Sequence, residues 1–294
     1  MCGHKENEFA WLSEQKPDMA VIAQGGPGDG VEWMNYCREA GMSYMSIVQC
    51  NMDTWWPMDY AGEMMASAYR EAKKVFFVSE HNRRLMEFQI GEALPRGEVV
   101  RNPINVPAEQ PPAWPKQNGT WNLACVARLE PSAKGQDVLL QILAQPKWRE
   151  RPVKVNFFGG GDWEKNLKKL ASFLQVKNAS FCGHVNDVRK IWEENHLLVL
   201  PSRQEGLPLA LVEAMWCARP AVVTAVGGNA EACDDGKTGF VAAAAAVSVL
   251  EPVLETAWNC RNDWQTMGKS ARVLVEELFP NSAVEDFCKK LTNA

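Results

Sequence analysis

The sequence lacks a long apolar run, an excess of positive charge and any Asp-x-Asp pair. Its longest weakly polar segment, residues 239–250, has about half of the length that a bilayer-spanning helix needs, and the N-terminus opens with charged residues. Acidic residues outnumber basic ones, 36 to 31, so no overall positive field favours nucleic acid or an anionic membrane surface. We therefore expect a cytoplasmic globular protein that binds no nucleic acid and holds any phosphate ligand by a local cluster.

The nine cysteines are scattered along the chain, and none of them forms a C-x-x-C pair. Several lie inside apolar runs that are typical of strands or helices. This distribution predicts reduced, mostly buried thiols, and it favours neither a disulfide framework nor a zinc site.

Short apolar runs alternate with amphipathic stretches along the first hundred residues. Strands are expected at 19–24, 43–49, 75–79 and 98–102, with helices at 31–40 and 61–74. Strands separated by helices predict a parallel sheet of βαβ units. With only three or four strands, this N-terminal Rossmann-like domain, assigned to residues 1–103, is shortened.

Prolines are dense between residues 104 and 118, which we interpret as a linker between two domains. The alternation then restarts and supplies five or six strands, which predicts a complete doubly wound domain over 119–278. The final segment, 279–294, is expected to form a helix that returns to the N-terminal domain. The predicted fold class is α/β, with two parallel-sheet domains of which the first is incomplete.

Glu213 is the single charged residue of the segment 206–218, where it lies among leucine, valine, methionine and tryptophan. A carboxylate in such a helix is costly unless a partner satisfies it. Glu205 lies in the loop before Pro208, where the helix presents its free N–H groups. Two carboxylates and free amides in one crevice suit a sugar joined to a phosphate, although both glutamates could equally be ordinary ion-pair partners.

Further polar groups follow other predicted strands, at the edge where open α/β sheets bind their ligands. Arg128 follows the strand 121–127, and Lys134 precedes the next helix, so both could meet a bound phosphate unless Lys134 pairs with Glu130. Glycine-containing turns follow the remaining strands, either as ligand contacts or as tight turns. Their candidate positions are Gly160, Gly183, His184, Val185, Gly227, Gly228 and Glu231.

With these motifs in place, the chain resembles glycosyltransferase family 4, whose members are retaining enzymes of the GT-B architecture. The resemblance rests on ARLEPSAKGQDVLL, FFGGGDW, FCGHV and the run from LLVLPSRQEGLPLALVEAMWCA to GKTGFV, in the family's order and near its usual spacing. In the N-terminal half, AYREAKKVFFVSEHNRRL and EVVRNPINV give a less distinctive match.

The resemblance implies roles for the residues at matching positions. It implies that Arg128 and Lys134 neutralise the donor diphosphate, that Glu213 binds the ribose hydroxyls, and that Glu205 with the Gly206 and Leu207 amides faces the donor sugar. Further donor contacts are implied at Gly160, His184, Val185, Gly227, Gly228 and Glu231. No metal and no cofactor is implied, and the donor base is expected to be uridine or guanosine.

The N-terminal half departs from the family pattern, in which a first strand and a glycine-rich loop usually come before the part of the fold where this sequence starts. His81 and Asn51 are the candidates for contacts from this side, with a solvent-facing histidine as the alternative for His81. A carbohydrate, lipid-linked or small-molecule acceptor is expected, and peripheral membrane contact or an oligomer that completes the domain stays open.

Three functional hypotheses follow. The first is sugar transfer from a nucleotide-diphosphate-sugar donor. The second is a non-catalytic or split sugar-nucleotide-binding subunit that needs a partner chain, which would leave an apolar sheet edge near the N-terminus. The third is a sugar-nucleotide epimerase or hydrolase, which would release free nucleotide without an acceptor.

Overall fold

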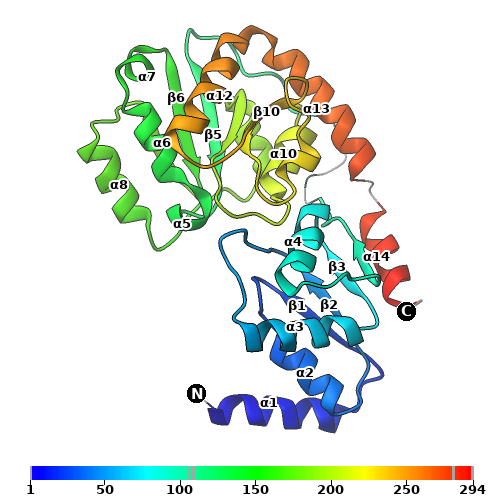
Figure 1. Ribbon diagram of the computed structural model, residues 1–294. Helices are drawn as coiled ribbons and strands as arrows, with labels where there is room; N and C mark the ends of the chain where they lie inside the picture. Colours follow the sequence, from blue (N-terminus) through cyan, green and yellow to red (C-terminus); the bar gives the residue numbers. More distant parts are fainter. Residues whose placement is uncertain (1, 105, 107–109, 280–281, 293–294) are drawn as a thin grey trace. The chain divides into compact units, whose positions relative to one another are not determined.

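The computed structural model describes residues 2–104, 106, 110–279 and 282–292. The chain forms two compact units, Met1–Asn102 together with Ala283–Ala294, and Pro103–Ser282 (Figure 1). Both units are α/β with parallel sheets, which confirms the predicted fold class. Within the expected linker, 104–118, positions 105 and 107–109 lie outside the described residues.

The first unit is built on a four-stranded parallel sheet in the order β1-β2-β3-β4. Its strands are β1 (Ala20–Gln24), β2 (Tyr44–Val48), β3 (Val75–Phe77) and β4 (Gly97–Val99), and its helices are α1 (Cys2–Gln15), α2 (Val31–Glu39), α3 (Asp59–Glu71) and α4 (Glu80–Ile90). The buried side chains of β2 and β3 pack with Met34, Met65, Tyr69 and Met86 from the helices. Helices α2, α3 and α4 thus bury their apolar faces on the sheet.

The strands of this unit follow one another in chain order across the sheet, so β1 is an edge strand. Within β1, Val21 is 47% exposed and Ala23 is also exposed. In a parallel sheet, where both faces are normally covered by helices, an exposed apolar pair of this kind is unusual.

The second unit holds a six-stranded parallel sheet in the order β10-β9-β8-β5-β6-β7. Its strands are β5 (Trp121–Val126), β6 (Val153–Phe158), β7 (Ala179–Gly183), β8 (Leu197–Leu200), β9 (Ala221–Thr224) and β10 (Gly239–Ala242). The chain builds outward from β5 in one direction and then returns to add β8, β9 and β10 on the other side. The strand order therefore reverses between β5 and β8, which is where doubly wound sheets bind ligands.

Nine α-helices surround this sheet in the described part of the unit. They are α5 (Pro131–Lys134), α6 (Gln136–Leu143), α7 (Pro146–Glu150), α8 (Glu164–Phe173), α9 (Val188–Glu194), α10 (Leu209–Trp216), α11 (Asn229–Ala232), α12 (Val247–Asn259) and α13 (Trp264–Leu278), with a 3₁₀ turn at Arg261–Asp263. Every residue of β8 and β9 is buried, as expected for strands covered on both faces. Trp148, Phe157 and Trp264 fill the core between the sheet and the helices.

Arg219 is a buried cation that fastens the proline-rich segment to the second unit. Its side chain is only 1% exposed, and its guanidinium donates to the carbonyl oxygens of Ala113 and Cys217, both at 2.7 Å, and of Asn195 at 3.1 Å. It also donates to the carbonyl oxygen of Trp192. Burial lowers the pKa of Arg219 to about 10. The backbone oxygens around it take the place of a carboxylate partner.

The last helix, α14 (Ala283–Thr292), belongs to the first unit. The Phe287 ring meets the buried Phe76 ring of β3 edge to face, with 5.1 Å between their centroids. Lys290 Nζ lies 2.8 Å from Oε2 of Glu98, and Lys74 Nζ lies 2.7 Å from its Oε1. The two ammonium groups lower the pKa of Glu98. A helix from the end of the chain is thus held by apolar and charged contacts to β3 and β4.

In the parts of the chain that the structure describes, no helix combines the length and the apolar character needed to cross a bilayer.

Candidate functional site

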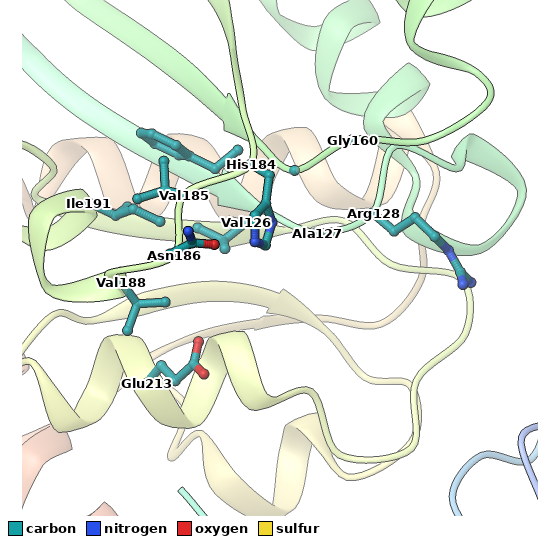
Figure 2. A pocket seen from close by; sticks show the side chains of 12 residues that line it. Val126, Ala127, Arg128, Gly160, His184, Val185, Asn186, Val188, Ile191 and Glu213 are labelled. Carbon is teal, nitrogen blue, oxygen red and sulfur yellow. The ribbon is translucent and has the colours of Figure 1, made fainter. Parts of the chain in front are cut away.

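A cavity of about 470 Å³ opens at the carboxyl ends of β5, β6 and β7 and faces α10 (Figure 2). It is lined by residues at and just after the ends of these strands, by α9 and by one residue of α10: Val126, Ala127, Arg128, Phe158, Gly159, Gly160, His184, Val185, Asn186, Val188, Ile191 and Glu213. The cavity thus lies at the edge of the sheet where the sequence placed the ligand. Of the predicted site residues, it brings together Arg128, Gly160, His184, Val185 and Glu213.

Glu213 faces this cavity from the middle of α10, across from His184 and Asn186 in Figure 2. Its neighbours Leu211, Val212 and Met215 are fully buried, and burial raises the pKa of the Glu213 carboxyl. Among the described residues no side chain pairs with this carboxylate. A partly buried acceptor that faces an open cavity without a partner is suited to hydroxyl donors from a ligand.

Arg128 extends from the end of β5, and its side chain is 66% exposed. Its Nη2 lies 2.5 Å from Oε2 of Glu130, so Glu130 pairs with Arg128 and not with Lys134. Gln136 Nε2 donates to the carbonyl oxygen of Arg128 at 2.8 Å, which fixes the loop to the start of α6. A largely exposed cation on a fixed loop can meet an anion that enters the cavity.

Glycines after β6 bring two loops into contact and shape one wall of the cavity. Gly159 has φ +125°, and a Cβ there would lie 2.2 Å from the carbonyl oxygen of Ala127. A Cβ on Gly161 would lie 2.5 Å from the carbonyl oxygen of Leu129. The Leu129 N–H donates to the carbonyl oxygen of Gly160 at 2.9 Å. These glycines are therefore required for close packing of the loops that follow β5 and β6.

Lys134 and Glu205 form a second cluster beside the cavity. Lys134 Nζ lies 2.9 Å from Oε1 of Glu205, and Ser202 Oγ donates to the same oxygen at 2.7 Å. Glu205 is 6% exposed. The Cys125 thiol of β5 has a pKa of about 12, raised mainly by burial and further by the Glu205 charge, while Lys134 lowers it. Cys125 adjoins Val126 of the cavity lining, so both clusters lie at the same edge of the sheet.

The loop after β9 packs directly on the backbone of this second cluster. Gly227 has φ +53°, and a Cβ there would lie 2.2 Å from the carbonyl oxygen of Glu205. The Gly228 N–H donates to the carbonyl oxygen of Gly206 at 2.6 Å. Gly227 thus permits the close approach of two chain segments, and the Gly228 N–H bond joins them. Leu207 is buried, at 5% exposure, so in this structure its side chain serves the core.

The helix after this cluster, α10, begins at Leu209, and Pro208 is its N-cap residue. The free N–H groups expected after Pro208 thus belong to a helix whose first residue is Leu209. Glu231 lies in the short helix α11, is partly exposed and is not among the residues that line the cavity. Lys134, Glu205, Gly206, Gly227 and Gly228 are likewise outside the described lining.

Asn186, Val188 and Ile191 line the cavity, although the sequence did not single them out. Asn186 follows His184 and Val185 directly, and Asp187 caps α9 by accepting from the Arg189 N–H at 3.1 Å. An Asn-Asp pair after the glycine of a strand end was the available signal, since such residues are typical of helix starts near ligands.

The two N-terminal candidates have partners inside the first unit. His81 Nε2 lies 3.3 Å from Oδ1 of Asp53. Asn51 is 2% exposed and donates from Nδ2 to Oε1 of Gln89 at 2.8 Å. Its own Oδ1 accepts from the Met52 N–H. Asn51 therefore holds the loop after β2 to α4, while the His81 ring is partly exposed.

The comparisons with known proteins find relatives of the second unit and of the fold. The sequence model of the family described as Glycosyl transferases group 1 matches residues 121–255, which span the second sheet. An uncharacterized glycosyltransferase of Haemophilus influenzae is 29% identical over 53% of this chain and 45% of its own length. The D-inositol 3-phosphate glycosyltransferase of Gordonia bronchialis is 27% identical over 58% of this chain and 39% of its own length. The chain thus spans less than half of the length of these relatives.

Solved structures extend the likeness to both units. HepE of Anabaena, solved in complex with UDP, has a TM-score of 0.78 at 17% identity and covers 97% of this chain and 82% of its own. TarM of Staphylococcus aureus has a TM-score of 0.80 at 17% identity, over 97% of this chain and 58% of its own. At this level of identity, the likeness shows the fold, which is the GT-B type expected from the sequence.

Proposed function

Since residues 121–255 match the group 1 glycosyltransferases, we propose that this chain transfers a sugar from a nucleotide-diphosphate-sugar donor to an acceptor hydroxyl, with retention at the anomeric carbon. The observation that carries the proposal is the Glu213 carboxylate, which faces the cavity of the second unit without a side-chain partner among the described residues. Arg128 lines the same cavity.

The nucleotide end of the donor is assigned to this cavity. Glu213 would accept hydrogen bonds from the two ribose hydroxyls, because a carboxylate offers two acceptors to a vicinal diol. A cavity of about 470 Å³ falls within the range of small-molecule sites. HepE is bound to UDP in its crystal structure, and a relative from Mycolicibacterium smegmatis is named as GDP-mannose-dependent, so uridine and guanosine donors are both proposed.

The diphosphate is assigned to Arg128 and Lys134. Arg128 extends beside the cavity mouth and supplies a planar, bidentate cation. Lys134 pairs with Glu205 at the same edge of the sheet, and a bound phosphate would compete with Glu205 for its ammonium group. The two cations would stabilise the charge that develops on the leaving diphosphate. We propose that they do so without a metal.

In the transfer itself, the bond between the anomeric carbon and the diphosphate oxygen breaks while the acceptor oxygen bonds to the same face of the carbon. The acceptor proton passes to the departing phosphate oxygen. Glu205, with the Gly206 and Leu207 amides, is proposed to face the donor sugar, and the acceptor is proposed to be a glycan, a lipid-linked sugar or a small molecule.

The test is a nucleotide screen on the full chain. UDP and GDP at about 100 times their dissociation constants should stabilise the fold by roughly 2.7 kcal/mol. Arg128→Ala and Glu213→Ala should each remove most of that stabilisation, whereas Lys168→Ala, in an exposed pair on α8, should keep it. Transfer is then measured with the best donor, with and without EDTA. A protein whose melting temperature no nucleotide changes would contradict the proposal.

A second candidate is a sugar-nucleotide-binding subunit that acts with a partner chain. The exposed Val21 and Ala23 of the edge strand β1 favour it, because an apolar parallel edge is suited to a further strand and its helix. This candidate predicts nucleotide binding without turnover in the isolated chain. Turnover by the isolated chain would exclude it.

A further inference from the structure

A second cavity, of about 360 Å³, lies in the second unit at the amino ends of the strands, opposite the end where the Glu213 cavity opens. It is lined by Arg149, Gln175, Lys177 and Asn178. Arg149 belongs to α7, which precedes β6, and Asn178 directly precedes β7. β6 has six residues, so roughly 20 Å of strand separates this edge from the Glu213 cavity. The two cavities are therefore distinct.

Two unpaired cations line this second cavity. In the described part of the chain, neither Arg149 nor Lys177 forms an ion pair. Their neighbours do, because Lys147 Nζ lies 2.5 Å from Oε1 of Glu251 and Arg151 Nη2 lies 2.5 Å from Oε1 of Glu255. Two unpaired positive charges in one hollow attract an anion.

Arg149 is held in position for such an anion. Its Nη2 donates to the carbonyl oxygen of Leu174 at 2.6 Å, which leaves the other guanidinium N–H groups for a ligand. Asn178 Nδ2 donates to the carbonyl oxygen of Trp148 at 3.1 Å, and this bond ties the loop before β7 to α7. The wall of the cavity is thus fixed from both sides.

Gln175 adopts a backbone conformation that a glycine would adopt more easily. Its φ is +54°, and it follows the last residue of the turn that ends α8. The Gln175 N–H donates to the carbonyl oxygen of Ser172, and the Val176 N–H to that of Ala171, which is the pattern of a Schellman cap. A side chain at this position costs stability, and strained residues of this kind are concentrated at ligand sites. Here the strained residue lines the cavity.

We propose that this second cavity binds a sugar phosphate. Arg149 and Lys177 would hold the phosphate, whose charge of about −1.5 to −2 at pH 7 matches two cations better than a single carboxylate does. The Gln175 and Asn178 amides would bind ring hydroxyls, since amides both donate and accept. The cavity volume suits one monosaccharide unit.

A purely structural role makes different predictions. Arg149 would then only cap the carbonyl end of α8, and Lys177 would only offset the helix dipole. Under that reading, Gln175→Gly stabilises the protein and changes nothing else. Under the proposal, the same substitution raises or keeps the melting temperature of the free protein and weakens ligand binding, so the two readings give opposite results for binding.

The experiment is calorimetric titration of the full chain with glucose 6-phosphate, with glucose and inorganic phosphate as separate arms. Glucose 6-phosphate should bind, with at least tenfold weaker affinity for Lys177→Met and for Gln175→Gly. Lys147→Met, on α7 but paired outside the cavity, is the matched control and should bind as the wild type does. Arg128→Ala should also retain binding, because Arg128 lines the other cavity.

Three results would overturn the proposal. Wild-type binding by Lys177→Met would place the ligand elsewhere, and loss of binding in Arg128→Ala alone would place it in the Glu213 cavity. Binding of glucose or inorganic phosphate as tight as that of glucose 6-phosphate would contradict a site built for both parts of the ligand. None of these results bears on the proposed transfer reaction, which is tested with nucleotides.

Discussion

Lys134 and Glu205 are joined by an ion pair, with Nζ 2.9 Å from Oε1, that links the end of α5 to the loop after β8. Glu205 is 6% exposed, and its other described side-chain partner is the Ser202 hydroxyl. A buried carboxylate that loses its cation keeps its desolvation cost without the compensating attraction. The pair therefore has a structural role in the protein without ligand, whatever it does when a phosphate is bound.

Lys134→Met should destabilise the fold by about 3 kcal/mol, at the low end for a buried pair because the lysine is partly exposed. The double variant Lys134→Met with Glu205→Gln should recover part of this loss, since no charge is then left uncompensated. Urea unfolding of both proteins measures the difference. A Lys134→Met protein as stable as the wild type would show that water replaces the ammonium group.

Glu213→Gln should stabilise the free protein and weaken nucleotide binding. Burial raises the pKa of Glu213 in the folded state above its unfolded value of about 4.3, so the folded protein binds the extra proton and stability falls as the pH rises through the raised pKa. At neutral pH the amide variant should melt about 2 °C higher. Below pH 4 the two proteins should melt alike.

The same substitution removes a charged acceptor from the proposed ribose contact, which is worth roughly 1.5–3 kcal/mol. Nucleotide affinity should therefore fall about tenfold to a hundredfold, as measured by titration at pH 7.5. Equal affinities for the two proteins would remove Glu213 from the nucleotide site.

Gly227→Ala should cost more than about 2 kcal/mol, because both the positive φ and the contact with the Glu205 carbonyl oxygen oppose a Cβ. Gly236→Ala is the matched control, since Gly236 has φ +75° and open space where its Cβ would be. This control should lose only about 1 kcal/mol. Thermal unfolding of the two variants separates the cost of the positive φ, which both share, from the clash with the Glu205 carbonyl oxygen, which only Gly227→Ala has. Equal losses of stability would mean that the loop relieves this clash by moving, without a free-energy cost.

Arg219→Met should destabilise the second unit by at least about 3 kcal/mol, since several buried carbonyl oxygens lose their donor. Arg219→Lys should restore little, because one ammonium group cannot reach oxygens on both sides of a planar fork. Arg84→Met, on the exposed face of α4, is the control and should change stability by less than about 0.5 kcal/mol. Chemical denaturation followed by tryptophan fluorescence measures the loss of unfolding free energy in each variant.

The two parallel sheets could be predicted from the sequence because each strand is a short apolar run between amphipathic stretches. The fully buried runs of β8 and β9 are typical of central parallel strands. Glu213 was found for a similar reason, as one charge in an otherwise apolar helix, and the structure places it on the cavity. Signals of this kind are local in the sequence, so they can be recognised without a structure.

Partners across the fold were harder to predict. Glycine indicates that something approaches closely, but not what, and at Gly227 the neighbour is the Glu205 backbone. Lys134 was considered as a partner of Glu130, which is near in sequence, whereas its partner in the structure is Glu205. Asn186 was missed because its one signal, the Asn-Asp pair before α9, indicates a helix start but does not show that a cavity lies beside it.

The first unit is closed by the last helix of the chain, so the second unit is inserted within it. A protease that cut once in the proline-rich segment would therefore not release two separate fragments. The edge-to-face contact of Phe287 with Phe76 and the ion pair of Lys290 with Glu98 would still hold the C-terminal piece to the N-terminal one. Conversely, removal of α14 would expose Phe76 of β3. A truncation at the C-terminus would therefore destabilise the unit that the N-terminal residues form.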